Sequence, residues 1–221
     1  MNTAAQTSIS ETVARVRALG ILPVVELDAV EYAEPLLDAL SAAGLPAAEI
    51  TLRTAAGLEA LRVLRQNRPD AFVGAGTVRT LADAERVIEA GAQFVVSPST
   101  YPELIELCLS AGVPALPGAC TPTDVDAAVR AGAPLVKFFP AEAMGGVAFL
   151  KALAGPFRDV HFVPTGGVNA SNLAAYLALP HVAACGGSWM VAPALLRERA
   201  FDRIEALARE AVEIVAKVRR V

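Results

Sequence analysis

Short apolar runs alternate with longer segments of helical periodicity along most of the chain. Four of the helical segments end in Ala-Gly, at positions 43–44, 90–91, 111–112 and 131–132, and an apolar run follows each one. Glycine takes the left-handed conformation of a helix end without steric cost, so each pair indicates a helix terminus. The apolar runs are too short and too rich in β-formers to be helices. Eight strands are therefore expected, at residues 21–27, 49–53, 72–76, 94–97, 113–116, 135–139, 161–164 and 182–185.

The segments between these runs have the apolar spacing of helices. Residues 81–88, for example, repeat apolar side chains every three or four positions. Thr121 and Asp124 have the spacing of a capping box, which satisfies free N–H groups at a helix start. An extra helix is expected at about residues 10–19, ahead of the first strand. From Phe201 onward, one apolar stripe predicts an amphipathic C-terminal helix.

Strict alternation of strands and helices predicts an α/β fold with a parallel sheet, which can be open or closed. Eight units in 221 residues, without a Gly-x-Gly-x-x-Gly fingerprint after the first strand, favour a closed (β/α)8 TIM barrel. No linker or low-complexity tract divides the chain, so residues 1–221 are expected to form one barrel domain. In such barrels the reactive side chains lie at the C-terminal ends of the strands.

The composition fits a largely buried chain. Hydrophobic residues make up 54% of it and charged residues 19%, below the ~25% of an average soluble domain. Gly, Pro or a charge breaks each apolar run before the roughly 18 residues of a membrane span, and no signal peptide is visible at the start. The net charge of −4 argues against a nucleic-acid partner. Three widely spaced cysteines indicate a reduced compartment, so a soluble, cytoplasmic protein is expected.

Lys137 is the lysine that the apolar pattern singles out. Lys151 lies in a helical segment and Lys217 on the final helix, whereas Lys137 is embedded in the apolar run 135–140. Burial there disfavours the ammonium form and leaves neutral amine that can attack a ketone. Lysine is rarely buried unless it is paired or used. The alternative is a lysine that is salt-bridged at a barrel rim or that reaches solvent from an edge strand.

The second predicted strand carries polar residues on one face. Period-two alternation places Glu49, Thr51 and Arg53 together, with Ile50 and Leu52 on the opposite face. A carboxylate and a guanidinium at a barrel mouth can serve as a proton shuttle and as an anchor for a substrate carboxylate. An ordinary half-exposed strand with a surface Glu–Arg pair explains the same pattern equally well.

Glycine-rich turns follow three of the predicted strands. In residues 74–77 (GAGT), the small residues let a ligand or a neighbouring backbone approach, and Thr77 offers a hydroxyl. Residues 164–167 (PTGG) and 186–188 (GGS) follow the seventh and eighth strands, where this fold usually binds phosphate, and a helix start is expected after each. Paired glycines can also simply form tight turns. Because two pairs occur at matching positions, a phosphorylated substrate is expected.

The remaining chemically active residues have ordinary structural explanations. His161 and His181 fall at the starts of the last two predicted strands, opposite the expected site. Without clustered His, Cys or carboxylate residues, no metal site is expected. The cysteines are expected to be packing residues: Cys108, Cys120 and Cys185.

Five segments together resemble the bacterial 2-keto-3-deoxy-6-phosphogluconate (KDPG) aldolases, a family that also includes enzymes acting on 4-hydroxy-2-oxoglutarate. They are residues 49–54 (EITLRT), 74–78 (GAGTV), 137–142 (KFFPAE), 164–167 (PTGG) and 186–189 (GGSW). The segments occur in the family's order over nearly the whole chain, and KFFPAE is the most specific of them. Three positions depart from the commonest pattern: Ser99, Cys120 and Met144.

The resemblance implies a class I aldolase that forms a Schiff base and needs neither metal nor organic cofactor. It would cleave the phosphorylated keto-deoxy acid reversibly to pyruvate and glyceraldehyde 3-phosphate, and it would act as a homotrimer. By similarity, Lys137 forms the imine, Glu49 moves protons, and Phe139 packs beside the imine. The other substrate contacts are Arg53, Thr77 and Thr165 for the pyruvate carboxylate, and Gly166, Gly167, Gly187 and Ser188 for the phosphate.

Three alternatives differ in substrate or in reaction. The same imine chemistry could act on 4-hydroxy-2-oxoglutarate or on the galactonate epimer. A phosphate-handling isomerase would want a neutral histidine at the site, and His161 and His181 are at the wrong strand ends. A non-catalytic phosphosugar-binding barrel would have to keep an unpaired, buried Lys137, which is costly.

Overall fold

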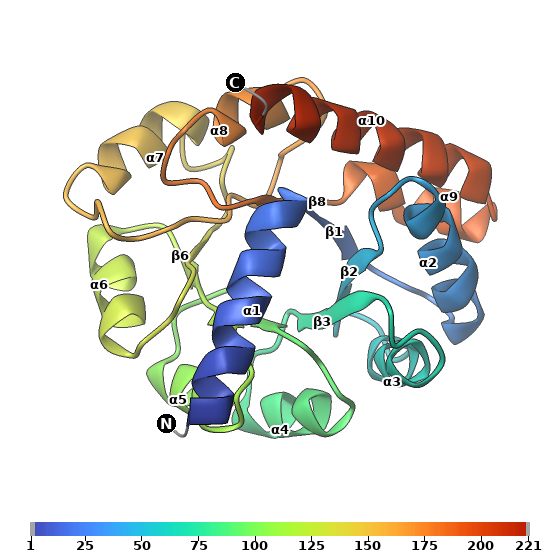
Figure 1. Ribbon diagram of the computed structural model, residues 1–221, viewed down its shortest axis with the longest axis horizontal. Coiled ribbons are helices and arrows are strands. Elements are labelled where there is room, and N and C mark those ends of the chain that lie inside the picture. Colours follow the sequence, from blue (N-terminus) through green and yellow to red (C-terminus); the bar gives the residue numbers. More distant parts are fainter. Residues whose placement is uncertain (1–2, 220–221) are drawn as a thin grey trace.

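A computed structural model describes residues 3–219 and has strands and helices in near-regular alternation (Figure 1). The elements in chain order are α1 (Thr3–Leu19), β1 (Ile21–Val25), the 3-10 helix η1 (Val30–Tyr32), α2 (Ala33–Ala42), β2 (Ala47–Thr51), α3 (Gly57–Asn67), β3 (Phe72–Gly76), α4 (Leu81–Glu89), β4 (Val95–Val96), α5 (Pro102–Ser110), β5 (Ala115–Leu116), β6 (Gly118–Ala119), α6 (Pro122–Arg130), β7 (Lys137–Phe138), α7 (Gly146–Ala154), α8 (Leu173–Leu177), β8 (Cys185–Gly187), the 3-10 helix η2 (Trp189–Val191), α9 (Pro193–Arg197) and α10 (Phe201–Arg219).

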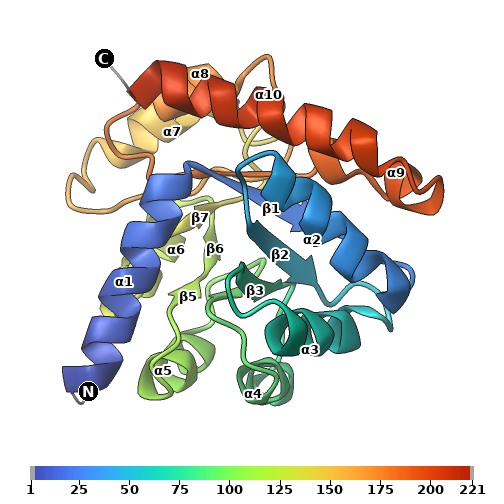
Figure 2. The ribbon, with the colours of Figure 1, turned by 45° about the vertical axis from the view of Figure 1, so that its right-hand side comes forward.

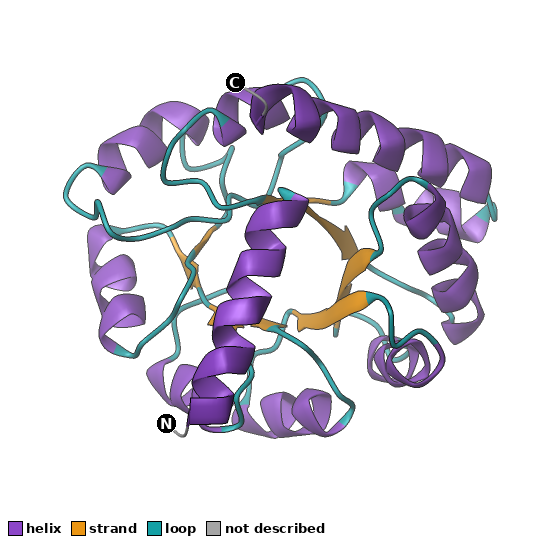
Figure 3. Cartoon of the chain, viewed as in Figure 1, coloured by secondary structure: helices purple, strands orange, loops and turns teal. Residues whose placement is uncertain are grey.

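The strands are parallel and close into a barrel (Figure 3). Six of them pair in the order β5-β4-β3-β2-β1-β8, and β6 pairs with β7. Pro117 has no N–H to donate and separates β5 from β6, so the two form one interrupted barrel strand. Single bridges from Phe162 to Val136 and to Val182, and from Thr165 to Gly186, complete the ring. The predicted (β/α)8 barrel is thereby confirmed.

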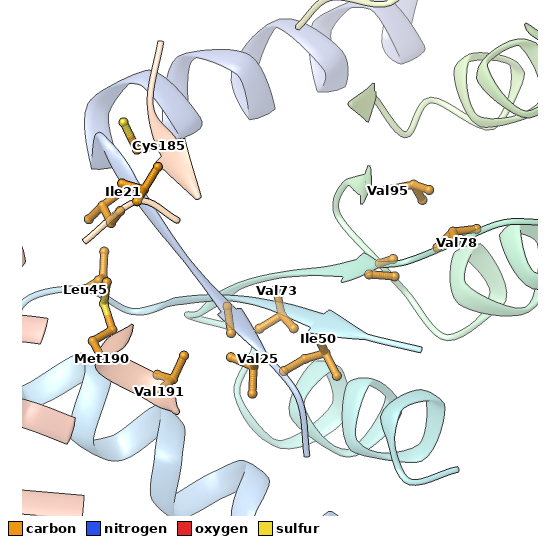
Figure 4. Packing of buried hydrophobic residues seen from close by; sticks show 14 of the residues in the cluster. Ile21, Val25, Leu45, Ile50, Val73, Val78, Val95, Cys185, Met190 and Val191 are labelled. Atoms are coloured by element: carbon orange, nitrogen blue, oxygen red, sulfur yellow. The ribbon is translucent and has the colours of Figure 1, made fainter. Parts of the chain in front are cut away.

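Two layers of apolar side chains surround the strands. The outer core lies between the strands and the helices, and Figure 4 shows Ile21, Ile50 and Val73 within it. The inner core fills the barrel itself, where the Phe72 and Phe94 rings pack with their centroids 4.8 Å apart. Besides Val16 of α1, its buried side chains come from the strands and from residues next to them around the ring: Leu22, Ala47, Phe72, Phe94, Val96, Leu116, Leu135, Val163, Ala183 and Ala184.

Helix α1 lies across the end of the barrel at which the strands begin, as Figure 1 shows. Its Val16 is fully buried against the inner core, and Val13 and Leu19 are partly buried beside it. At the other end of the chain, α10 packs on α2 and α8 (Figure 2), with Ile204, Ala208, Ala211 and Val215 buried. Both terminal helices predicted from the apolar pattern are confirmed.

Several predicted boundaries move by a few residues. The second strand is Ala47–Thr51, because Ala47 and Ala48 pair with β3, so Arg53 lies beyond its end. The eighth strand is Cys185–Gly187 instead of 182–185, since these three residues pair with Ile21–Pro23 of β1. Residues 161–164 form isolated bridges instead of a continuous strand. Of the two predicted glycine-turn helix starts, Ser188 leads into η2, but α8 begins only at Leu173. Over residues 3–219, no helix has the length and hydrophobicity to cross a membrane.

Candidate active site

Lys137 points into the barrel from β7. Its N–H donates to the Pro117 carbonyl at 2.9 Å, and its residue pairs with Gly118 of β6. The neighbours Val136 and Phe138 belong to the outer core, whereas Leu135 belongs to the inner core. Alternation therefore directs the Lys137 side chain inward, where the residue is only 4% exposed. This burial agrees with the prediction from the apolar pattern and excludes a lysine that reaches solvent.

Glu49 of β2 faces Lys137 across the barrel interior. Lys137 Nζ lies 3.7 Å from Glu49 Oε1, and the two side chains are 5% and 4% exposed. That separation gives an ion pair without a hydrogen bond, and within residues 3–219 Oε1 has no hydrogen-bond partner. A buried carboxylate oxygen is costly unless it is hydrogen-bonded. Oε1 is therefore available to accept a proton from a substrate or from a water beside the lysine.

An aromatic ring and glycines border this pair. Lys137 Nζ lies 5.0 Å from the centre of the Phe139 ring, within the range of a cation–π contact. A Cβ atom on Gly76 would lie 2.2 Å from Glu49 Oε1, and one on Gly74 would lie 2.5 Å from the Phe94 ring. The glycines of the GAGT segment therefore leave room for the Glu49 carboxylate and for the packing of the Phe94 ring.

Arg53 and Thr77 meet at the rim of the barrel. Arg53 Nε donates to Thr77 Oγ1 at 3.2 Å, and Arg53 Nη1 lies 3.5 Å from Glu26 Oε2. The Arg53 side chain is 45% exposed, and a cleft of about 630 Å³ opens beside it. The prediction that Arg53 belongs to the strand is wrong, because the strand ends at Thr51. Its guanidinium is nevertheless at the C-terminal end of the barrel and can contact an anionic ligand.

Sequence reasoning missed Glu26. It follows the apolar strand β1 directly and pairs with Arg53. A signal was available in the sequence, because Glu26 is an acidic residue within the apolar run 21–27. Glu26 holds the Arg53 guanidinium at the rim in this structure.

The two glycine-rich loops lie next to each other. Thr165 bridges to Gly186, and the Thr165 N–H donates to the Phe138 carbonyl at 2.9 Å. Gly166 and Gly167 have φ values of +98° and +81°, which only glycine adopts readily. Throughout the described part of the chain, their N–H groups find no acceptor. Such N–H groups can bind an anion.

The second loop has a different construction. Gly187 leaves space for the Trp189 ring, because a Cβ atom there would lie 2.0 Å from the ring. Ser188 is exposed and immediately precedes η2. Its hydroxyl is accessible to a ligand at the mouth of the barrel.

The histidines lie at the other end of the barrel, as predicted. Burial lowers the pKa of His161, and the positive charges of Arg17 and His181 lower it further. Arg17 belongs to α1, which covers the end opposite the loops. In the range 3–219, no group of three or more His, Cys, Asp or Glu side chains is placed to hold a metal ion.

The geometry thus assembles a buried amine, a buried carboxylate, a guanidinium at the rim and free loop N–H groups. Comparisons with known proteins agree on one family. A family model described as "KDPG and KHG aldolase" matches residues 12–207. A protein of Treponema pallidum (strain Nichols) named 2-dehydro-3-deoxy-phosphogluconate aldolase is 45% identical over 208 residues, covering 94% of this chain and 98% of that protein.

A Pseudomonas aeruginosa protein of the same name is 48% identical over 207 residues, with 92% of this chain and 93% of that protein covered. Among solved structures, a KDPG aldolase from Legionella pneumophila has a TM-score of 0.86 and 37% identity. The match covers 90% of this chain and 97% of that one, and pyruvate is captured there as a covalent carbinolamine intermediate.

Proposed function

The chain belongs to the KDPG and KHG aldolase family, and on that premise we propose that it is a class I aldolase. Its reaction is the reversible cleavage of 2-dehydro-3-deoxy-6-phosphogluconate to pyruvate and D-glyceraldehyde 3-phosphate. The observation that carries the proposal is the buried pair of Lys137 and Glu49, whose Nζ and Oε1 atoms are 3.7 Å apart. An amine beside a proton acceptor is what imine formation requires.

The first half of the reaction attaches the substrate to Lys137. The neutral amine attacks the C2 carbonyl and forms a carbinolamine, and loss of water then gives a protonated imine. Glu49 takes up and returns the protons of these steps, either directly or through one water. Phe139, with its ring 5.0 Å from Nζ, packs against the imine and helps to exclude bulk water.

The second half breaks the C3–C4 bond. A base removes the proton of the C4 hydroxyl, the bonding pair moves toward the imine nitrogen, and the aldehyde leaves. The enamine that remains is stabilised because the imine accepts the electrons. Glu49 delivers a proton to the former C3, and water then hydrolyses the imine, which releases pyruvate and restores Lys137.

The remaining site residues bind the two anionic ends of the substrate. Arg53, Thr77 and Thr165 are assigned to the pyruvate carboxylate, since a guanidinium and hydroxyl groups match carboxylate oxygens, and Arg53 already contacts the Thr77 hydroxyl. The unpaired N–H groups of Gly166 and Gly167 support a phosphate at the adjacent loops. Gly187 and Ser188 complete that phosphate site.

The assembly and the compartment are part of the same proposal. We infer a homotrimer, which gives three times the 22.9 kDa chain mass in light scattering. Three free cysteines support a reduced compartment such as the cytoplasm.

Reductive trapping tests the mechanism. The protein is incubated with pyruvate and sodium borohydride, and the added mass is located by peptide mass spectrometry. We expect a pyruvyl adduct on Lys137 and none after Lys137→Ala. Lys151→Ala, on the exposed face of α7, serves as the matched control and should keep the adduct. A folded wild-type protein without an adduct on Lys137 would contradict the class I mechanism.

Steady-state kinetics can compare two substrates, because the family model is named for aldolases of both KDPG and KHG (4-hydroxy-2-oxoglutarate). 4-Hydroxy-2-oxoglutarate has the same keto-acid end but lacks the phosphate. We expect the phosphorylated substrate to have the higher kcat/KM, owing to the free N–H groups of Gly166 and Gly167. Equal values for the two substrates would show that these loops do not contribute to selection.

A further inference from the structure

The Gly166–Gly167 loop is supported from behind by side chains for which the mechanism has no use. The Glu142 N–H donates to the Gly166 carbonyl at 3.0 Å. The side-chain amides of Asn169 and Asn172 both donate to the Gly167 carbonyl at 3.1 Å. The carbonyls of Gly166 and Gly167 are thus both hydrogen-bonded within the protein, whereas the N–H groups of these two glycines remain available to a ligand.

Glu142 contacts the loop through its side chain as well. A Cβ atom on Gly167 would lie 2.6 Å from Glu142 Cγ and 2.7 Å from its Cβ. The stem of Glu142 therefore packs directly against the Gly167 backbone. Gly167 has a φ of +81°, and glycine has wide conformational freedom. Loss of the Glu142 stem would remove the contact that restricts this backbone.

Tyr176 holds the carboxylate of Glu142 in place. The Tyr176 hydroxyl donates a hydrogen bond to Glu142 Oε1, and Tyr176 is fully buried. Burial and the neighbouring carboxylate raise the pKa of Tyr176, so it remains a donor at physiological pH. A Cβ atom on Gly146 would lie 3.0 Å from the same Oε1 atom, which places the carboxylate at the first turn of α7. The positive end of that helix stabilises a negative charge.

We propose that Glu142, fixed by Tyr176, is a positioning residue for the phosphate of the substrate. This inference rests on the proposed function, in which the Gly166 and Gly167 N–H groups receive that phosphate. Glu142 acts through the loop and does not attract the ligand, because its own charge would repel a phosphate. Tyr176 and the α7 terminus keep that charge fixed while the stem supports the loop.

The test separates the two ends of the substrate by running the reaction in the condensation direction. The variants are Glu142→Ala, which removes the stem, Tyr176→Phe, which removes the hydrogen bond, and Glu142→Gln, which keeps the shape without the charge. We expect the KM for D-glyceraldehyde 3-phosphate to rise roughly tenfold in the first two, as for the loss of about one hydrogen bond. The KM for pyruvate and the rate of borohydride trapping should stay within about twofold of wild type.

Glu142→Gln should remain close to wild type, because an amide oxygen still accepts from Tyr176. The matched controls are Tyr101→Phe, at the start of α5, and the exposed Glu106→Ala within α5; neither should change any constant. With unphosphorylated D-glyceraldehyde as acceptor, all variants should behave alike. An unchanged KM for glyceraldehyde 3-phosphate in both folded variants, or an equal rise of both KM values, would overturn the proposal.

A binding measurement distinguishes this inference from the proposed function itself. Inorganic phosphate is titrated into wild type and variants while the amide NMR signals of Gly166 and Gly167 are followed. Weaker phosphate binding in Glu142→Ala and Tyr176→Phe supports the positioning role even if the wild type has no aldolase activity. Unaltered phosphate binding in both variants, or no phosphate binding by the wild type, contradicts it. Should Glu142→Ala fail to fold, phosphate binding by Tyr176→Phe alone tests the positioning role in the same way.

Discussion

At the scale of single residues, the proposed chemistry depends on side chains that are kept out of water. Lys137 and Glu49 are nearly inaccessible, and glycines at 74 and 76 make space around them. Charge–charge interactions are stronger in such an interior than at the surface, and an unpaired buried charge is correspondingly costly. Removal of either charge would therefore leave the other one buried and unpaired, at a cost in stability.

Replacement of Glu49 by Gln tests its role as proton carrier. The amide keeps the size of the side chain but cannot take up a proton. We expect kcat to fall by about 10²–10⁴-fold, the usual contribution of a general acid–base group. Steady-state kinetics measures this change, with Glu59→Gln on the exposed face of α3 as control. A kcat within a factor of three of wild type would show that another group carries the proton.

The buried thiols predict a dependence of stability on alkaline pH. Burial raises the pKa of Cys108 from 9.0 to about 12, and burial also raises the pKa of Cys185. A thiol with a raised pKa in the folded state binds its proton more tightly there than in the unfolded chain. Its contribution to stability is therefore complete below pH 9 and is lost as the pH rises from 9 to 12.

Denaturant titrations at pH 8, 10 and 11 measure that loss. In Cys108→Ala, the free energy of unfolding should decrease less steeply as the pH rises. Iodoacetamide at pH 8 should label Cys108 only after unfolding, because the thiolate is the reactive form. Rapid labelling of Cys108 in the native protein would contradict the burial described here.

At the scale of elements, the sequence predicts where strands and helices lie better than where they end. The Thr121–Asp124 capping box was predicted from its spacing and is present, because both partners lie within one helical turn. The start of β2 at Ala47 was missed, since Ala47 and Ala48 are poor strand formers whose conformation comes from pairing with β3. Arg53 was misplaced because the pairing of β2 with β3 ends at Thr51, opposite Gly76.

In the candidate site, too, local sequence signals could be predicted and contacts between distant residues could not. Lys137 could be identified as a lysine within an apolar run, and Glu49 from the polar strand face that it shares with Thr51 and Arg53. The contact of Tyr176 with Glu142, beside the Gly166–Gly167 loop, could not, because the two residues are 34 positions apart and neither shows a periodic signal. Contacts of this kind depend on how two helices pack against a loop, which the secondary-structure propensities of single residues do not encode.

Truncation of Val16 tests how firmly α1 is attached to the barrel. Val16 is fully buried in the inner core, so Val16→Ala removes two methyl groups and leaves a cavity. We expect the free energy of unfolding to fall by about 2 kcal/mol. Urea denaturation measures it, with the exposed Ser10→Ala as control, which should change stability by less than about 0.5 kcal/mol. Equal stability of the two variants would show that α1 is only loosely docked.

At the scale of the whole molecule, closure of the ring makes distant parts of the chain depend on one another. β8 pairs with β1, and α10 packs on α2 and α8. The outer core extends from Ile21 to Val215 without division. Removal of any one strand would open the ring and expose both cores.

We therefore expect the chain to unfold as one domain in a single transition. Trp189, the one tryptophan of the sequence, reports on the region after β8, whereas far-UV circular dichroism reports on all helices. The two signals should give the same midpoint in guanidinium chloride. Separate midpoints would indicate two independently folding parts and would contradict the expectation of one domain.

The position of α1 has a consequence for the order of events in catalysis. Helix α1 covers the end at which the strands begin and the inner core fills the barrel, so a ligand is expected to reach the buried Lys137 from the end that carries the glycine-rich loops. Under the proposed function, the aldehyde product occupies the exit and has to leave first, and pyruvate follows. In the synthetic direction pyruvate has to enter before its partner. Access from one end, together with the covalent bond of pyruvate to Lys137, thus gives one order for both directions: pyruvate binds first in synthesis and is released last in cleavage.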